Sequence, residues 1–250
     1  MPYRYLTISV DDGFPDDSKA ADLLHKYGLQ ATFYVPARNP ERAVMPPSQV
    51  RELSLRFEIG GHTYNHTPLA VLPDETARIE ICDGKKWLED LLGKPAVSFC
   101  YPRGKFNRRT PTFVKQAGFQ GARTCLFNLH AIPENPFLWG LSTHAYNHSP
   151  LIQVRHALLE RNFAGLRNFC TVYKGATHWQ AHFFHGLRYV EQHGGVAHLY
   201  FHSWEVGELG QWQLLDSVLH SAAQHALTPV TNGMLFQHWE QLRRGVQNFP

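Results

Sequence analysis

The sequence of 250 residues has few cysteines and no long hydrophobic run. Cys82, Cys100, Cys125 and Cys170 form no C-x-x-C pair and are too sparse for a disulfide framework. No stretch approaches the roughly 18 apolar residues that cross a bilayer. The first residues lack the basic start, apolar run and small-residue cleavage site of a secretory leader. We therefore expect reduced thiols and a cytoplasmic protein without a membrane span.

An excess of charge of one sign is also missing. The 24 Lys and Arg against 21 Asp and Glu leave a net charge of +3, too small to indicate a nucleic acid or a membrane surface as partner. Histidine is abundant instead: protonating all 16 would move the net charge from +3 to +19, which predicts strong pH dependence. His178, His182 and His185 would share one helix face, a spacing more typical of packing or a solvated face than of a metal site.

Short apolar runs alternate with amphipathic stretches along the chain. Seven runs are predicted as strands: Tyr3–Val10, Gln30–Val35, Phe57–Gly60, Ala96–Phe99, Phe119–Ala122, Leu138–Ser142 and Val196–Phe201. The predicted helices are Asp16–Tyr27, Ser48–Arg56, Asp74–Leu92, Thr110 to Gly118, one or two between Pro150 and Tyr173, Thr177–Gln192, Gln211–His225 and Leu235–Arg244. Repeated βα units indicate an α/β fold with a parallel sheet, either open or closed into a barrel. No Gly-, Pro- or Ser-rich linker divides the chain, so a single domain over residues 1–250 is expected.

Polar side chains follow the predicted strands at their carboxyl ends. In a parallel βα barrel this rim is where catalytic groups lie. The first strand is followed by Asp11 and Asp12, and the third by His62 with His66 close behind. The later strands are followed in turn by Tyr101-Pro102-Arg103-Gly104, Arg123, His144 and His202. Carboxylates and imidazoles from distant parts of the sequence would thus converge on one rim.

Two histidines and one carboxylate around an open position are typical of a catalytic zinc site. His62 and His66 are four residues apart, a spacing that brings both imidazoles to one face if the loop turns helical. Asp12 could supply the oxygen ligand, and Asp11 would stay free to take a proton from metal-bound water. Taken alone, the Asp-Asp pair is equally typical of a turn that caps the next helix. The two motifs together favour the metal site.

Four motifs occur in a characteristic order: T-I-S-V-D-D-G at residues 7–13, H-T-Y-N-H at 62–66, Y-P-R-G at 101–104 and L-Y-F-H at 199–202. In this the sequence resembles the polysaccharide deacetylase family (carbohydrate esterase family 4). The acidic pair followed by H-x-x-x-H is the most specific part of the resemblance. It implies a distorted (β/α)7 barrel and a divalent metal, usually zinc.

By the same resemblance, the charged rim residues have distinct roles. Asp12, His62 and His66 would be the metal ligands. Asp11 would be the general base that deprotonates the attacking water, and His202 the general acid that protonates the departing amine. The implied reaction removes an acetyl group from an amino sugar and releases acetate.

Substrate contacts are expected around this centre. The resemblance implies that Tyr101 to Gly104 form a groove wall, with a backbone N–H near Arg103 that helps to hold the oxyanion. Trp204 and Glu205 lie two and three residues after the general-acid position and could meet a sugar ring and its hydroxyls, although Trp204 fits equally well as core filler.

The histidine motif has a second, nearly identical copy. Residues 62–69 read H-T-Y-N-H-T-P-L and residues 144–151 read H-A-Y-N-H-S-P-L. The family order assigns the first copy to the metal. His144 of the second copy is therefore predicted to contact substrate, while the alternative is that His144 and His148 only lie near a helix that begins at Ser149-Pro150.

Two orienting groups common in the family are missing. An Arg usually stands two residues before the proline of the third motif, where it orients the base, and here that position is Cys100. Many members also tune the acid histidine with an Asp, but no Asp occurs between residues 91 and 215. Glu134 with Trp139, or Glu205, could replace it.

The leading hypothesis is a metal-dependent carbohydrate N-deacetylase. The same machinery could instead cleave an O-acetyl ester or remove a formyl group. A catalytically weak carbohydrate-binding homologue is the third alternative, which the missing Arg favours and the retained Asp11 and His202 oppose.

Overall fold

A computed structural model of the chain describes residues 3–245. Its strands are all parallel and lie in the order β5-β4-β3-β2-β1-β7-β6, with β8 beside β1. Their bounds are β1 (Arg4–Asp11), β2 (Thr32–Val35), β3 (Glu58–Gly61), β4 (Ser98–Cys100), β5 (Gly121–Arg123), β6 (Thr143–His144), β7 (Gly195–Phe201) and β8 (Thr228–Pro229). The predicted parallel α/β architecture is confirmed.

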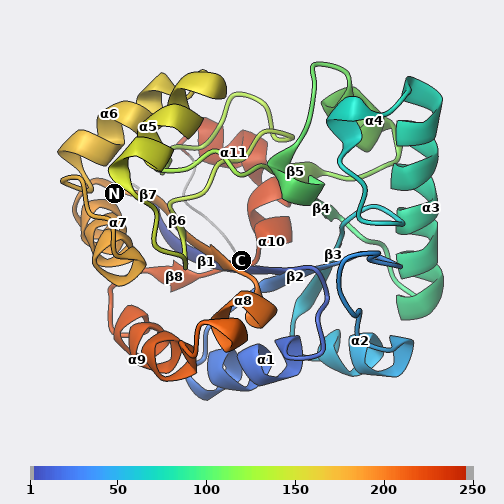
Figure 1. The fold of residues 1–250 in the computed structure, drawn as a ribbon, viewed down its shortest axis with the longest axis horizontal. Coiled ribbons are helices and arrows are strands. Elements are labelled where there is room, and N and C mark those ends of the chain that lie inside the picture. Colours follow the sequence, from blue (N-terminus) through green and yellow to red (C-terminus); the bar gives the residue numbers. More distant parts are fainter. Residues whose placement is uncertain (1–2, 246–250) are drawn as a thin grey trace.

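Helices surround the sheet (Figure 1). They are α1 (Asp17–Lys26), α2 (Pro47–Leu53), α3 (Asp74–Leu92), α4 (Thr110–Gln116), α5 (Pro150–Leu159), α6 (Phe163–Thr171), α7 (Trp179–His193), α8 (Ser203–Glu208), α9 (Trp212–Ala222), α10 (Asn232–Gln237) and α11 (Trp239–Arg243), with short 3₁₀ turns η1 (Leu69–Val71) and η2 (Pro102–Gly104). None of the described helices combines the length and the apolar character that crossing a bilayer requires.

Strands β1 and β7 form the centre of the sheet. They pair over seven residues, and nearly all of their side chains are buried on both faces. Such double burial is typical of parallel strands covered by helices. Because β1 ends at Asp11 and β7 at Phe201, the residues that follow these two strands emerge side by side at one rim.

The sheet curls into a distorted barrel that is closed by an irregular segment. Trp139 forms a parallel bridge with Arg123 of β5. A few residues later β6 pairs with Leu199 and Tyr200 of β7. Residues 139–144 therefore connect the two ends of the sheet, and the barrel closes without a continuous strand at this seam.

Two predicted elements differ from the structure and two further elements were not predicted. The sixth strand is Thr143–His144 rather than Leu138–Ser142, because pairing with β7 begins only at the end of the seam. The last predicted helix is divided at His238 into α10 and α11. Helix α8 and strand β8 were not predicted, since α8 is short and β8 ends on a proline, which is uncommon within a sheet.

His130, His182 and His198 lie away from the rim, and each is buried beside a neutral hydroxyl group. His198 lies 2.8 Å from the Ser9 hydroxyl, and His182 lies 2.8 Å from the Thr143 hydroxyl. Burial lowers the pKa of His130 to about 4 and those of His182 and His198 to about 3. These imidazoles are thus neutral in the folded protein, and His182 belongs to the packing rather than to a metal site.

The buried histidines predict acid instability. Each takes up a proton near pH 6.5 when unfolded but only near pH 3 to 4 when folded, so the unfolded state binds more protons as the pH falls below 6.5. The loss at pH 5 relative to pH 7 should be about 2 kcal/mol per buried histidine. Urea unfolding at both pH values measures it, with His182→Gln expected to reduce the difference and exposed His178→Gln to leave it unchanged. Equal stability of the wild type at both pH values would contradict this.

Candidate active site

A cavity of about 500 Å³ opens at the carboxyl rim of the barrel. Asp11 is the last residue of β1 and Asp12 follows it, while His62 follows β3 and His202 follows β7. All four side chains line this cavity. The convergence expected from the order of strands and polar residues is therefore present.

Three side chains form a compact group that could hold a metal. The His66 Nε2 atom lies 3.0 Å and the His62 Nε2 atom 3.6 Å from Asp12 Oδ1. The three ligand atoms lie within 4.8 Å of one another, and all three residues are buried. Burial raises the pKa of Asp12, but the neighbouring imidazoles of His62, His66 and His202 outweigh this and hold the pKa well below its usual range. Asp12 is thus an ionised ligand.

The group fits a divalent metal in two further respects. The His62 Nδ1 atom lies 2.8 Å from the Cys100 carbonyl oxygen, so Nδ1–H donates there and the Nε2 lone pair faces Asp12. Asp12 Oδ1 is buried and accepts no well-formed hydrogen bond from the described residues. A buried carboxylate oxygen of this kind needs a cation, and one held between two imidazoles and a carboxylate would supply it.

The loop that carries the two histidine ligands is fixed by α3. Both carboxylate oxygens of Glu80 accept hydrogen bonds from Asn65, one from its backbone N–H at 2.9 Å and one from its side-chain amide at 2.7 Å. A side chain at Gly84 would come within 2.6 Å of the Thr63 carbonyl carbon, so only glycine allows this approach. Thr63 and His66 have positive φ angles of 64° and 55°, a conformation that these contacts maintain.

The Asp11 carboxylate is held by a guanidinium that the sequence motifs do not include. Arg123 of β5 is fully buried and forms an ion pair with Asp11 Oδ2. Burial raises the pKa of Asp11, but the charge of Arg123 outweighs this and leaves it lowered. Arg123 also lies 4.5 Å from the centre of the Tyr200 ring, which shields the pair from water.

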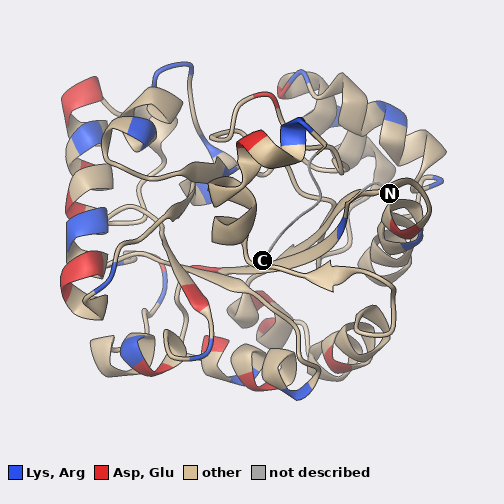
Figure 2. Ribbon diagram, turned by 180° about the vertical axis from the view of Figure 1, so that it is seen from behind, with Lys and Arg blue, Asp and Glu red and all other residues tan. Residues whose placement is uncertain are grey.

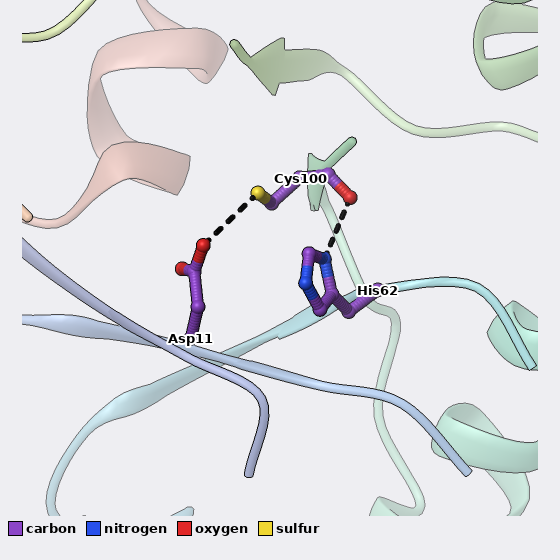
Figure 3. A group of neighbouring side chains, drawn as sticks. All are labelled: Asp11, His62 and Cys100. Carbon is purple, nitrogen blue, oxygen red and sulfur yellow. Dashed lines mark hydrogen bonds between the residues drawn. The ribbon is translucent and has the colours of Figure 1, made fainter. Parts of the chain in front are cut away.

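Arg123 occupies a place equivalent to the missing family Arg. Cys100 of β4 and Arg123 of β5 are direct partners in the sheet register. The Cys100 thiol lies 3.5 Å from Asp11 Oδ2, and its backbone carbonyl orients His62 (Figure 3). The guanidinium therefore reaches the base from the adjacent strand, at the same level of the barrel.

Asp11, His62 and Cys100 form a second group whose ligand atoms lie within 4.8 Å of one another. Burial raises the pKa of the Cys100 thiol well above its ordinary value, which favours the protonated sulfur. Asp11 Oδ2 is already paired with Arg123. The Asp12 group is the better metal site.

The ion pair with Arg123 predicts a large stability effect. Arg123→Met leaves the Asp11 carboxylate buried without its partner and should cost about 3–5 kcal/mol. Arg109→Met, which removes an exposed ion pair to Asp74, should cost at most about 1 kcal/mol. The double variant Cys100→Arg/Arg123→Cys returns the guanidinium to β4 and should recover part of the loss. Urea unfolding tests all three, and equal losses for the two single variants would show that Asp11 does not depend on Arg123.

His202 completes the rim and has a carboxylate partner of its own. Its Nδ1 atom lies 3.5 Å from Glu205 Oε2, and its Nε2 atom lies 3.8 Å from Asp12 Oδ2. Burial lowers the pKa of His202, but the Glu205 hydrogen bond and the nearby aspartates outweigh this and raise it. Of the two alternatives for the missing Asp, the structure has Glu205 here, whereas Trp139 packs against Phe236 in the core.

His144 of the second histidine motif contacts the same carboxylate, that of Glu205. His144 Nε2 lies 2.8 Å from Glu205 Oε2, and His144 Nδ1 lies 3.0 Å from His148 Nε2. Both ring nitrogens of His144 thus have protein partners, although the ring itself lines the cavity. Glu205 is shared between His144 and His202, and their hydrogen bonds outweigh the effect of burial and lower its pKa to about 2.

Of the other residues predicted to contact substrate, two line the cavity and one lies in the core. Arg103 and Trp204 line the cavity, and the Trp204 indole N–H donates to Asp12 Oδ2 at 2.9 Å. Arg103 forms an ion pair with Glu41. Tyr101 does not form a groove wall: its side chain is fully buried and its hydroxyl donates to the Phe137 carbonyl oxygen at 3.1 Å. The chain turns after β4, so that Tyr101 faces the core and Arg103 the cavity.

A buried carboxylate–imidazole triad, flanked by a second carboxylate and a third imidazole at the rim of a parallel barrel, defines a hydrolase-type site. Residues 1–122 match the family model described as polysaccharide deacetylase. A peptidoglycan-N-acetylglucosamine deacetylase from Bacillus cereus is 33% identical over 147 residues, which are 56% of this chain and 66% of that protein. The chain belongs to the polysaccharide deacetylase family, as the motifs indicated.

Solved structures extend the likeness over the whole barrel. A family 4 carbohydrate esterase from Streptomyces lividans matches 92% of this chain and 100% of its own, with a TM-score of 0.55 and 14% identity. The peptidoglycan deacetylase PdaC from Bacillus subtilis matches 97% of this chain and 92% of its own, with a TM-score of 0.57 and 15% identity. The distorted (β/α)7 barrel predicted from the resemblance is confirmed.

Proposed function

We propose that this protein is a metal-dependent hydrolase that removes N-acetyl groups from an amino-sugar glycan or glycoconjugate and releases acetate. The observation that carries the proposal is the pairing of opposite charge states beside one ligand triad. Asp11 is paired with Arg123, and His202 has Glu205 3.5 Å from Nδ1 and directs Nε2 towards Asp12, so a proton acceptor and a proton donor flank the same point. Asp12, His62 and His66 are the residues proposed to hold the divalent cation, most simply zinc.

A divalent cation held by these residues would polarise the acetyl carbonyl and make the attacking water more acidic. The protein groups then divide the proton transfers between them. Asp11 accepts the proton of the attacking water, and Arg123 keeps this carboxylate in place through the step. His202 donates a proton from Nε2 to the departing amine. The Glu205 carboxylate, which faces Nδ1 of the same ring, stabilises the imidazolium.

The cavity wall supports a sugar substrate. Its volume of about 500 Å³ suits one or two sugar residues, and Arg103 and Trp204 present a cation and an indole to it. Arg42 lies 3.4 Å from the centre of the Trp204 ring and covers one of its faces. Trp204 therefore positions Asp12 through its N–H and offers its remaining ring surface to the substrate.

We further propose that residues 1–250 act as one catalytic unit in the cytoplasm. Four unpaired cysteines, two of them exposed, suit a reducing compartment. The matched part is only 66% of the Bacillus cereus relative, so its peptidoglycan substrate is not carried over to this chain.

Metal content and acetate release test the function together. The purified protein should hold one equivalent of divalent metal, and Asp12→Ala/His62→Ala should lose it. Asp11→Asn should retain the metal and lose turnover by about 100-fold or more. Acetate release from N-acetylated but not from O-acetylated sugars supports the N-deacetylase.

The alternatives give different results. Faster release from O-acetylated sugars would identify an esterase, and formate release from N-formyl sugars a deformylase. Sugar binding without any turnover would identify a carbohydrate-binding homologue. Full metal content in the Asp12→Ala/His62→Ala variant, or normal turnover in Asp11→Asn, would overturn the residue assignments.

A further inference from the structure

Helix α5 is exposed on its apolar face. Leu151, Leu158 and Leu159 share one side of the helix, and Leu151 and Leu158 are 76% and 52% exposed. The opposite side, which packs on the protein, presents Gln153 and Ala157. Surface helices normally turn their apolar residues inward, so α5 has the reverse arrangement.

The apolar surface continues onto α6. Phe163, the first residue of α6, is 64% exposed. Five of the ten exposed large hydrophobic side chains among the described residues fall between positions 151 and 163. A cluster of this size on a helical hairpin marks an interaction site.

The charges around this surface are predominantly positive. Exposed Arg155, Arg161, Arg167 and Lys174 lie on or next to the hairpin, and none forms an ion pair with a carboxylate of the described residues. Glu160 is the only acidic residue between positions 150 and 175. By contrast, basic and acidic residues alternate along α3 (Figure 2). The overall charge of +3 therefore conceals a local cationic surface.

The hairpin also borders the active site. His156 and Glu160, at the end of α5, line the same cavity as Asp11 and His202. A neighbouring cavity of about 610 Å³ shares Glu160 and adds Arg161. The exposed apolar face, the cationic residues and the mouth of the catalytic cavity thus form one continuous region.

We propose that the α5–α6 hairpin (residues 150–171) docks on an anionic lipid bilayer surface. Exposed Leu and Phe side chains beside Arg and Lys are the composition of a helix that lies in the membrane interface, where the apolar groups insert and the cations meet lipid phosphates. A symmetric contact with a second copy of the chain would bring these cations against one another.

Docking in this way places the catalytic cavity against the membrane. The substrate would then be an amino-sugar glycoconjugate anchored in the lipid, reached at the membrane surface. This second part rests on the proposed function, whereas the docking itself does not.

Co-sedimentation with vesicles tests the docking. The wild type should bind vesicles of phosphatidylglycerol, bind phosphatidylcholine vesicles weakly, and dissociate as salt is raised. Leu151→Ser/Leu158→Ser/Phe163→Ser should bind phosphatidylglycerol vesicles at least about tenfold more weakly. The matched control is Leu55→Ser/Val71→Ser, which removes side chains that are 84% and 81% exposed elsewhere and should bind like the wild type.

The cationic residues are tested in the same assay. Arg155→Gln/Arg161→Gln/Arg167→Gln should weaken binding and reduce its salt dependence, whereas Arg51→Gln/Lys115→Gln should leave both unchanged. Thermal unfolding verifies that each variant is folded, which is expected because all of the replaced side chains are exposed.

Three results would overturn the docking proposal. The first is failure of the wild type to bind phosphatidylglycerol vesicles, and the second is equal binding by the hairpin variants. The third is a dimer in analytical ultracentrifugation that the Leu151→Ser/Leu158→Ser/Phe163→Ser variant abolishes, because the hairpin would then be a dimer interface. Vesicle binding by the wild type without acetate release from any substrate would reject the proposed function alone.

Discussion

Two buried carboxylates stand next to each other at the end of β1, and the rest of the site is arranged around the positive charge that they require. Asp11 and Asp12 are both buried, so water cannot solvate their negative charges. Asp11 receives a guanidinium from β5, whereas Asp12 receives imidazoles from the loop after β3 and an indole N–H from α8. Four elements that are distant in the sequence must therefore meet before either carboxylate is stabilised.

This division of partners separates two chemical roles. Arg123 satisfies Asp11 without coordinating it, so Asp11 is left available to accept a proton. Asp12 keeps one oxygen without a hydrogen bond from the described residues, so it is left available to a cation. A similar division occurs at His202, where Glu205 takes Nδ1 and leaves Nε2 facing the triad. In each case one atom is fixed by the protein and the other is directed to the reaction.

The sequence predicted the parts of this arrangement that depend on local order. Asp11, Asp12, His62 and His202 each follow a strand, and parallel strands all present their ends at the same rim. Helix α3 has the predicted bounds because it is long, strongly periodic and ends at Gly93, whose φ of 66° suits a helix terminus. Features of this kind can be read without knowing which strands are neighbours.

Other parts depend on register and packing and could not be read in this way. Arg123 replaces the missing Arg because it pairs with Cys100 across β4 and β5, a relation between two strands. The sequence offered one signal for this role, namely that the basic residue Arg123 ends the strand that follows β4. Tyr101 was wrongly expected in the groove wall, since a single turn of the backbone after β4 decides whether it faces the cavity or the core. Glu205 contacts both His144 and His202 because β6 pairs with β7. The irregular seam at residues 139–144 made that pairing impossible to predict from the sequence.

X-ray absorption spectroscopy of the zinc-loaded protein tests the central claim most directly, because it distinguishes the two ligand groups that share His62. The account predicts a first shell of nitrogen and oxygen atoms at about 2.0–2.1 Å, with the multiple scattering of two imidazoles and no sulfur. A sulfur ligand at about 2.3 Å would place the metal on Cys100 and Asp11 instead. That result would contradict the assignment of Asp12 as ligand and of Asp11 as the base held by Arg123.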